Sequence, residues 1–67
     1  MNKFSQRLKD LRLEAHLSQK ELAQKMGVNQ NTVSCWECGT RQPDYDTLVN
    51  IAKRFNVSTD YLLGIVD

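Results

Sequence analysis

Polar side chains collect on one side of a short helix predicted over residues 30–38. At about 100° per residue, Val33 and Trp36 fall on the opposite side and point to a protein interior. The outward side chains are those of Gln30, Asn31, Ser34, Cys35 and Cys38. A glutamine or asparagine amide can pair bidentately with adenine, and a serine hydroxyl can bond to several bases. The pattern therefore favours hydrogen bonding to base edges, although any amphipathic helix has a polar outer side.

Two helix starts and a glycine between them must position these side chains. Ser18 and Glu21 form a capping-box pattern that begins a first helix, and Gly27 ends it. Asn29 is the cap of the second helix, which ends at Gly39. Because so few residues separate the two helices, they must meet at a steep angle. Such a pair can place its second helix in the major groove of DNA.

One carboxylate breaks the amphipathic pattern of the second helix. Glu37 lies close to Val33 on the inward side, where an unpaired carboxylate is costly. Arg12 stands at the edge of the apolar stripe of an earlier helix, predicted from about Lys3 to Ala15, and is the candidate partner. We predict a partly buried Arg12–Glu37 ion pair that ties the two helices together. The alternative is a solvent-exposed Glu37 at the helix end.

The segment LSQKELAQKMGVNQNTVSCWECGTRQPD resembles the helix-turn-helix of the Xre/Cro/CI family, which includes the lambdoid phage repressors. The resemblance continues through DTLVNIAKRFNVSTDYLLG and covers residues 4–65. It implies an all-α, compact five-helix lambda-repressor-like DNA-binding domain, with the helix-turn-helix at helices 2 and 3, residues 18–38. It also implies a transcriptional regulator, usually dimeric, on double-stranded DNA.

The resemblance assigns roles by position. It implies base reading by Gln30, Asn31, Ser34 and Cys35, and contact with DNA phosphates by Ser18, Gln19, Asn29, Thr32, Cys38 and Arg41. The family glutamine that Gln19 matches also supports the first residue of the recognition helix. Arg12 and Glu37 match a salt-bridged pair known in the family. Cys35 and Cys38 depart from the family pattern, because a thiol is a poor base reader and a poor phosphate ligand.

The spacing Cys35-x-x-Cys38 invites a metal or redox interpretation. A structural zinc ion needs four ligands, and His16 is the only other candidate. A disulfide between residues one helical turn apart would strain a regular helix. We therefore expect no metal site and two free thiols in a reducing cytoplasm, with a redox switch as an alternative.

Length and composition agree with a small DNA-binding protein. The 67 residues predict one domain, residues 1–67, with a core that is marginal for its size. We expect a cytoplasmic protein with no membrane span, no signal peptide, no cofactor and no small-molecule ligand. A single histidine and no glycine-rich phosphate loop argue against an enzyme. Residues 1–43 carry a net charge of +3 and residues 44–67 one of −2, although ordinary scatter explains such small counts equally well.

The C-terminal segment, residues 57–67, is rich in apolar side chains. So small a domain cannot easily bury Tyr61, Leu62, Ile65 and Val66 together, and exposed apolar patches mark interfaces. We predict a homodimer through these four residues, which would place two recognition helices about 34 Å apart on an inverted repeat. The alternative is that they close the core against Leu13 and Phe55. An antitoxin that also binds a toxin, and a protein-interaction module on the same fold, remain alternative functions.

The remaining helices follow from apolar spacing and caps. Helix 1 is predicted from about Lys3 to Ala15, with Leu13 packing on a second side of that helix. Its inward stripe is Phe4, Leu8, Leu11 and Ala15. Asp44 and Asn56 are the predicted start and end of helix 4, and Ser58 caps a short last helix.

Overall fold

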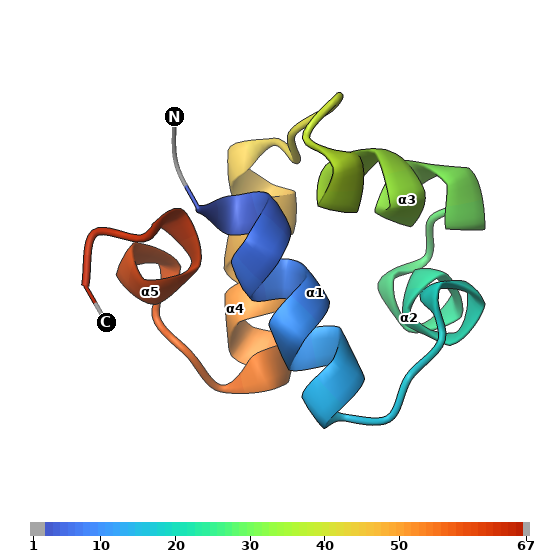
Figure 1. The fold of residues 1–67 in the computed structure, drawn as a ribbon, viewed down its shortest axis with the longest axis horizontal. Helices are drawn as coiled ribbons and strands as arrows, with labels where there is room; N and C mark the ends of the chain where they lie inside the picture. The colour runs from blue at the N-terminus through green and yellow to red at the C-terminus, as the bar shows by residue number, and fades with distance from the viewer. Residues whose placement is uncertain (1–2, 67) are drawn as a thin grey trace.

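The computed structural model describes residues 3–66 and shows five α-helices in this range, with no strand (Figure 1). Residues 1, 2 and 67 of the predicted domain lie outside the described part, and residue 67 also belongs to the predicted dimer segment. The helices are α1 (Phe4–Glu14), α2 (Gln19–Met26), α3 (Gln30–Cys38), α4 (Tyr45–Phe55) and α5 (Thr59–Leu63). None of these helices has the length and apolar character needed to cross a membrane.

Short-range hydrogen bonds set the starts of four helices, as the sequence predicts. Side-chain oxygens of Ser18, Asn29, Asp44 and Ser58 each accept a hydrogen bond from the backbone N–H three residues later. The capping box is complete, with Glu21 N to Ser18 Oγ at 3.0 Å and Ser18 N to Glu21 Oε1 at 2.9 Å. α1 has no side-chain cap and is one residue shorter at each end than predicted.

Two of these caps also hold a carboxylate in its charged form. The Ser18 backbone N–H, followed by the Ser18 side chain, lowers the pKa of Glu21 below its ordinary value. The hydroxyl and then the backbone N–H of Thr47 lower the pKa of Asp44 in the same way. Glu21 lies in the first turn of α2 and Asp44 is the N-cap of α4, and the helix dipole also favours negative charge at both positions.

Helix ends follow equally local rules. Gly27, Gly39 and Gly64 take left-handed conformations directly after α2, α3 and α5. Asn56 does the same after α4 with φ of 56°, as predicted. Asparagine tolerates this region better than most side chains, so the chain can turn there without glycine.

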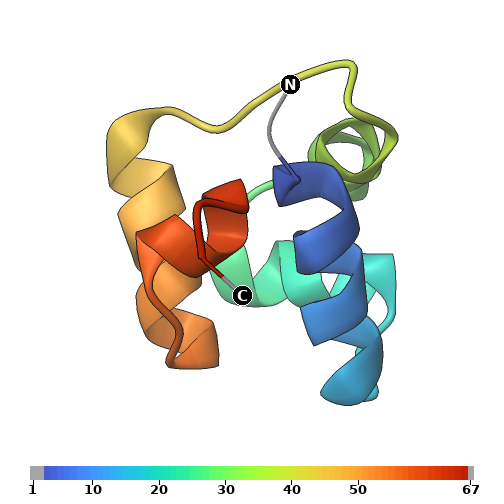
Figure 2. The same ribbon diagram turned by 60° about the vertical axis from the view of Figure 1, so that its left-hand side comes forward.

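All five helices contribute to one core. Its buried residues are Phe4, Leu8, Leu11, Leu22, Ala23, Val33, Trp36, Ile51, Ala52 and Leu62. Figure 2 shows α5 lying between α1 and α4. Two predictions for α1 were wrong: Ala15 is exposed because the helix stops before it, and Leu13 remains 52% exposed. Leu13 points away from the core, and no second layer covers it within the described residues.

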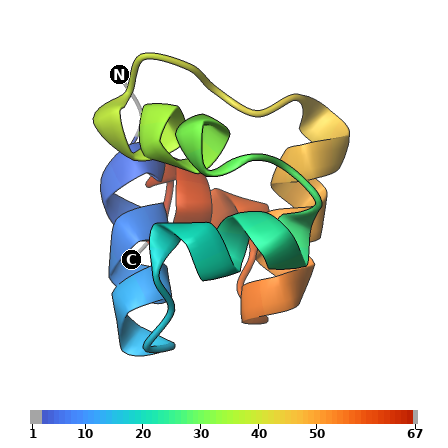
Figure 3. The same ribbon diagram turned by 90° about the vertical axis from the view of Figure 1, so that its right-hand side faces the viewer.

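α2 and α3 lie together on the side of α1 opposite to α5. In Figure 1, α2 is seen nearly end-on while α3 lies across the view, so the two helices cross at a steep angle. Figure 3 looks onto this side and shows both helices without another element in front of them. The predicted steep crossing is therefore present, and α3 is open to a partner.

Candidate nucleic-acid interface

The outer side of α3 is accessible along its whole length. Gln30, Asn31 and Cys38 are exposed, whereas Ser34 and Cys35 are half-buried. The inner side is anchored by Val33 and Trp36, which are 0% and 4% exposed. The structure thus brings the five outward side chains of the sequence analysis onto one accessible face.

Each end of α3 is fixed by local contacts. Asn29 Oδ1 accepts hydrogen bonds from Thr32 N at 2.8 Å and from Thr32 Oγ1 at 2.9 Å. At the other end, the backbone N–H groups of Thr40 and Arg41 both donate to Cys35 O, at 3.1 and 3.4 Å. The Arg41 side chain is exposed on the loop that follows. These contacts give the outward side chains a rigid backbone.

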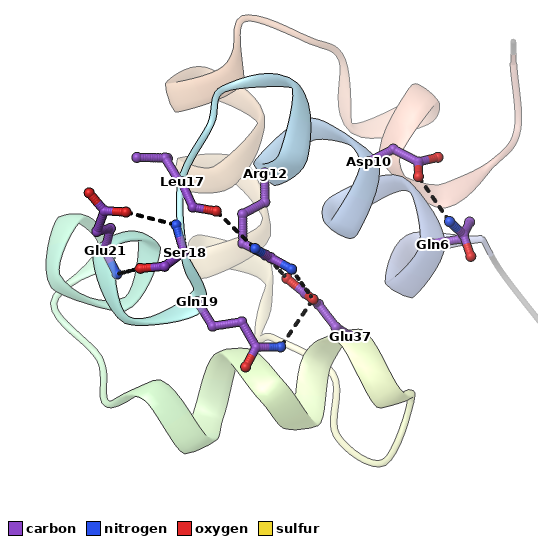
Figure 4. A network of polar contacts seen from close by, with 8 residues as sticks. All are labelled: Gln6, Asp10, Arg12, Leu17, Ser18, Gln19, Glu21 and Glu37. Carbon is purple, nitrogen blue, oxygen red and sulfur yellow. Dashed lines mark hydrogen bonds and ion pairs between the residues drawn. The ribbon is translucent and has the colours of Figure 1, made fainter.

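A buried polar network joins α3 to the two preceding helices (Figure 4). Arg12 Nε donates to Glu37 Oε2 at 2.7 Å, and Arg12 Nη2 donates to Glu37 Oε1 at 3.1 Å. The side chains of this ion pair are only 10% and 4% exposed. Arg12 Nη1 also donates to Leu17 O at 2.8 Å, so the guanidinium bonds to the chain just before α2. The predicted Arg12–Glu37 contact is therefore a bidentate pair inside the protein.

Gln19 takes part in the same network, which sequence reasoning missed. Its Nε2 donates to Glu37 Oε1 at 3.2 Å, so the glutamine is held against the last turn of α3. Because a carboxylate only accepts hydrogen bonds, the amide nitrogen must face Glu37, and one amide hydrogen remains for another acceptor. The contact joins residues 18 positions apart, so no local sequence spacing predicts it.

A further contact missed from the sequence ties α1 to the end of α3. Ser5 Oγ donates to Trp36 O at 2.6 Å, which satisfies a carbonyl in the last turn of that helix. Ser5 lies on α1 one residue after Phe4, and only its polar character next to a buried position hinted at a role. α3 is therefore held by α1 through both a hydroxyl and an ion pair.

Of the four residues predicted for a dimer surface, three have accessible side chains. Ile65 is 68% exposed, Val66 is 47% exposed and Tyr61 is half-buried. Leu62 requires a correction, because its side chain is 0% exposed and belongs to the core. α5 must place one side chain inward between α1 and α4, and Leu62 occupies that position. A fully buried side chain cannot contact a second copy.

A basic side chain of α1 secures this C-terminal segment. Arg7 Nη1 donates to Tyr61 O at 3.1 Å and to Val66 O at 3.0 Å. The guanidinium carbon also lies 4.3 Å from the centre of the Tyr61 ring, in cation–π geometry. These contacts span more than fifty residues of sequence, which is why the sequence did not predict them.

Known proteins resemble this chain over the residues that form these helices. A family model described as helix-turn-helix matches residues 8–62. The HTH-type transcriptional regulator ImmR of Bacillus subtilis (strain 168) is 48% identical over 61 residues, which cover 91% of this chain and 48% of that relative. The chain spans about half the length of this and other curated relatives that it matches.

Two solved structures show the same fold. A transcriptional regulator from Listeria innocua matches with a TM-score of 0.91 and 30% identity, covering 100% of this chain and 63% of that one. The P22 c2 repressor, solved in complex with a synthetic operator, matches with a TM-score of 0.85 and 27% identity. The match covers 94% of this chain and 96% of that chain. The predicted five-helix, lambda-repressor-like fold is confirmed by these likenesses.

Proposed function

The chain belongs to the helix-turn-helix family of the Xre/Cro/CI type, and from that membership we propose that it is a transcriptional regulator that binds double-stranded DNA by sequence. One observation carries the proposal. The polar face of α3 stands open, while Val33, Trp36 and Glu37 lock the other face into the protein. A rigid, exposed polar helix is what base reading in the major groove requires.

In this proposal α3 enters the major groove. Gln30 and Asn31 lead the base contacts, since both are exposed amides in the first turn, and Ser34 follows one turn later. Cys35 stands at the next outward position, where a thiol offers weak hydrogen bonding. Base contact by Cys35 is the least supported of the four.

Phosphate contacts flank the readers. Gln19 offers its remaining amide hydrogen, and Arg41 offers an exposed guanidinium on the loop after α3. Ser18 Oγ and Asn29 Oδ1 accept helix-cap hydrogen bonds, so the Ser18 hydroxyl hydrogen and the Asn29 amide nitrogen remain as donors to a phosphate. Thr32 Oγ1 donates its hydrogen to Asn29, so a phosphate contact by Thr32 would require that bond to be exchanged. Cys38 offers the poorest phosphate contact of this set, because its thiol is a weak donor and its backbone N–H lies within α3 and donates to the preceding turn.

We further propose that the protein acts as a homodimer and represses transcription. The exposed Ile65 and Val66, with Tyr61 beside them, give each copy an apolar patch that Arg7 holds in place. A two-fold pair through this patch would present two α3 helices to an inverted repeat. Occupying such an operator blocks access of the polymerase.

Selection from a randomised duplex pool at about 150 mM salt, near physiological ionic strength, tests the proposal. We expect enrichment of an inverted repeat with half-site centres about one helical turn apart. Enrichment of a single half-site would refute the dimer while keeping base reading. Weak binding without any enrichment would refute sequence-specific regulation and favour a protein-interaction module.

A further inference from the structure

The two thiols of α3 stand on the face proposed to meet DNA, where a thiol adds little hydrogen bonding. Cys35 is half-buried and Cys38 exposed, and both are free. They stand three positions apart, so they share the outward side of the helix. Cys38 also borders a surface hollow whose other lining residues include Lys3 and Gln42. A small ion can therefore reach Cys38 directly from solvent, and the Cys35 side chain is partly accessible beside it.

Helix geometry decides what this pair can bind. Side chains three positions apart on a helix have Cβ atoms about 5–6 Å apart. A disulfide needs about 3.5–4.5 Å between Cβ atoms, so an intact α3 keeps the thiols too far apart for one. A thiolate–metal–thiolate unit with two bonds of about 2.3 Å spans about 4.6 Å between sulfurs, which modest side-chain rotation accommodates. The spacing favours a bridging ion over a sulfur–sulfur bond.

The ligand count then selects the kind of ion. Zinc needs four ligands, and the described residues contain no group of three or more His, Cys, Asp or Glu side chains that could hold it. Soft thiolates prefer Cu(I), an ion that two sulfurs in a line can satisfy. We propose that Cys35 and Cys38 form a two-thiolate binding site for Cu(I). The expectation of no metal site came from four-ligand coordination, which this ion does not need.

Binding changes the charge of the outward face of α3. One Cu⁺ ion displaces one proton from each of two neutral thiols, giving a dithiolate complex of charge −1 and two released protons. If this face binds DNA, as the proposed function states, the new negative charge and the added ion oppose entry into the groove. The site would therefore make DNA binding responsive to copper, and this second step rests on the proposed function.

Anaerobic titration of the whole chain against the Cu(I)–bathocuproine disulfonate complex tests the site without DNA. We expect the protein to remove one Cu(I) per chain from the chelator. C35S and C38S should each lower the Cu(I) affinity by about 100-fold or more, because the second thiolate binds intramolecularly. M26L, which removes the thioether of α2, is the matched control and should keep the affinity. One ion per two chains, or full affinity in either serine variant, overturns the intrachain site.

Operator affinity with and without Cu(I) tests the coupling, with each protein compared with itself. Copper should weaken binding by the wild type about tenfold or more, because the added negative charge faces the phosphates. It should not change binding by C35S/C38S, whatever the starting affinity of that variant. Equal affinity of the loaded and metal-free wild type overturns the coupling. Absence of operator binding by the metal-free protein overturns the proposed function, and the chelator titration still decides the metal site.

Discussion

Removing the Glu37 carboxylate should destabilise the protein more than any surface substitution. In Glu37→Ala, the Arg12 guanidinium keeps its bond to Leu17 O but loses both bonds to the carboxylate. Its side chain is only 10% exposed, so a charge would remain in the interior without a counter-charge. Breaking one side of a buried pair costs about 3–5 kcal/mol. A domain of this length has about 3–10 kcal/mol of stability in total, so most of it should disappear.

Urea unfolding followed by the fluorescence of Trp36 measures this loss. The protein contains one tryptophan, which is buried in α3 next to Glu37, so the signal reports on the affected helix. The double variant R12M/E37L removes both charges and should lose less stability than Glu37→Ala, because no unpaired charge is left behind. A loss below about 1 kcal/mol in Glu37→Ala, the level of an exposed pair, would refute the reasoning. So would a double variant less stable than the single one.

Other predictions concern DNA binding, association and pH. Gln30→Ala should cost about 1–3 kcal/mol at the selected operator and relax preference at one base pair, whereas equal loss on random duplexes would contradict base reading. Arg41→Ala should weaken binding to all sequences and reduce the salt slope by about one, as salt titrations would show; a changed base preference would make Arg41 a reader. Ile65→Asp should raise the dimer dissociation constant in analytical ultracentrifugation; at concentrations where the wild type is monomeric it should not lower the melting temperature, since Ile65 is 68% exposed; loss of folding would place this side chain in the core. Because hydrogen bonds hold the pKa values of Glu21 and Asp44 low in the folded state, the stability they contribute is complete at neutral pH. This stability should be lost as pH falls through about 4 and below. In E21Q/D44N, the urea concentration at the unfolding midpoint should therefore decrease less at acid pH than in the wild type.

The sequence predicted most of the fold because the signals for helix starts and ends are local. Ser18, Asn29, Asp44 and Ser58 each act on the backbone three residues ahead, so their role can be read without knowing the tertiary structure. Apolar spacing likewise located Val33 and most of the α1 stripe. The Arg12–Glu37 contact could be predicted for another reason. A carboxylate on an apolar helix face needs a cationic partner, and few cations were in reach.

What the sequence did not predict depends on how helices meet. The hydrogen-bond partners of Gln19 and Ser5 lie on another helix, so they follow only from the way α1, α2 and α3 cross. Apolar character alone did not distinguish Leu62, which is buried, from Ile65, which is exposed. Leu13 shows the same limit, because an apolar residue off the main stripe can simply remain in solvent. Assigning these side chains needs the three-dimensional arrangement.

The local caps of α2 to α5 also bear on how long the protein lasts in a cell. Helical domains whose structure is specified by near neighbours fold in about microseconds to milliseconds. When closing is that fast relative to proteolytic cleavage, degradation follows the equilibrium fraction of open molecules rather than the rate of opening. The abundance of the protein should therefore track its thermodynamic stability closely. A substitution inside the Arg12–Glu37–Gln19 network would then lower the amount of protein as well as its affinity for any partner.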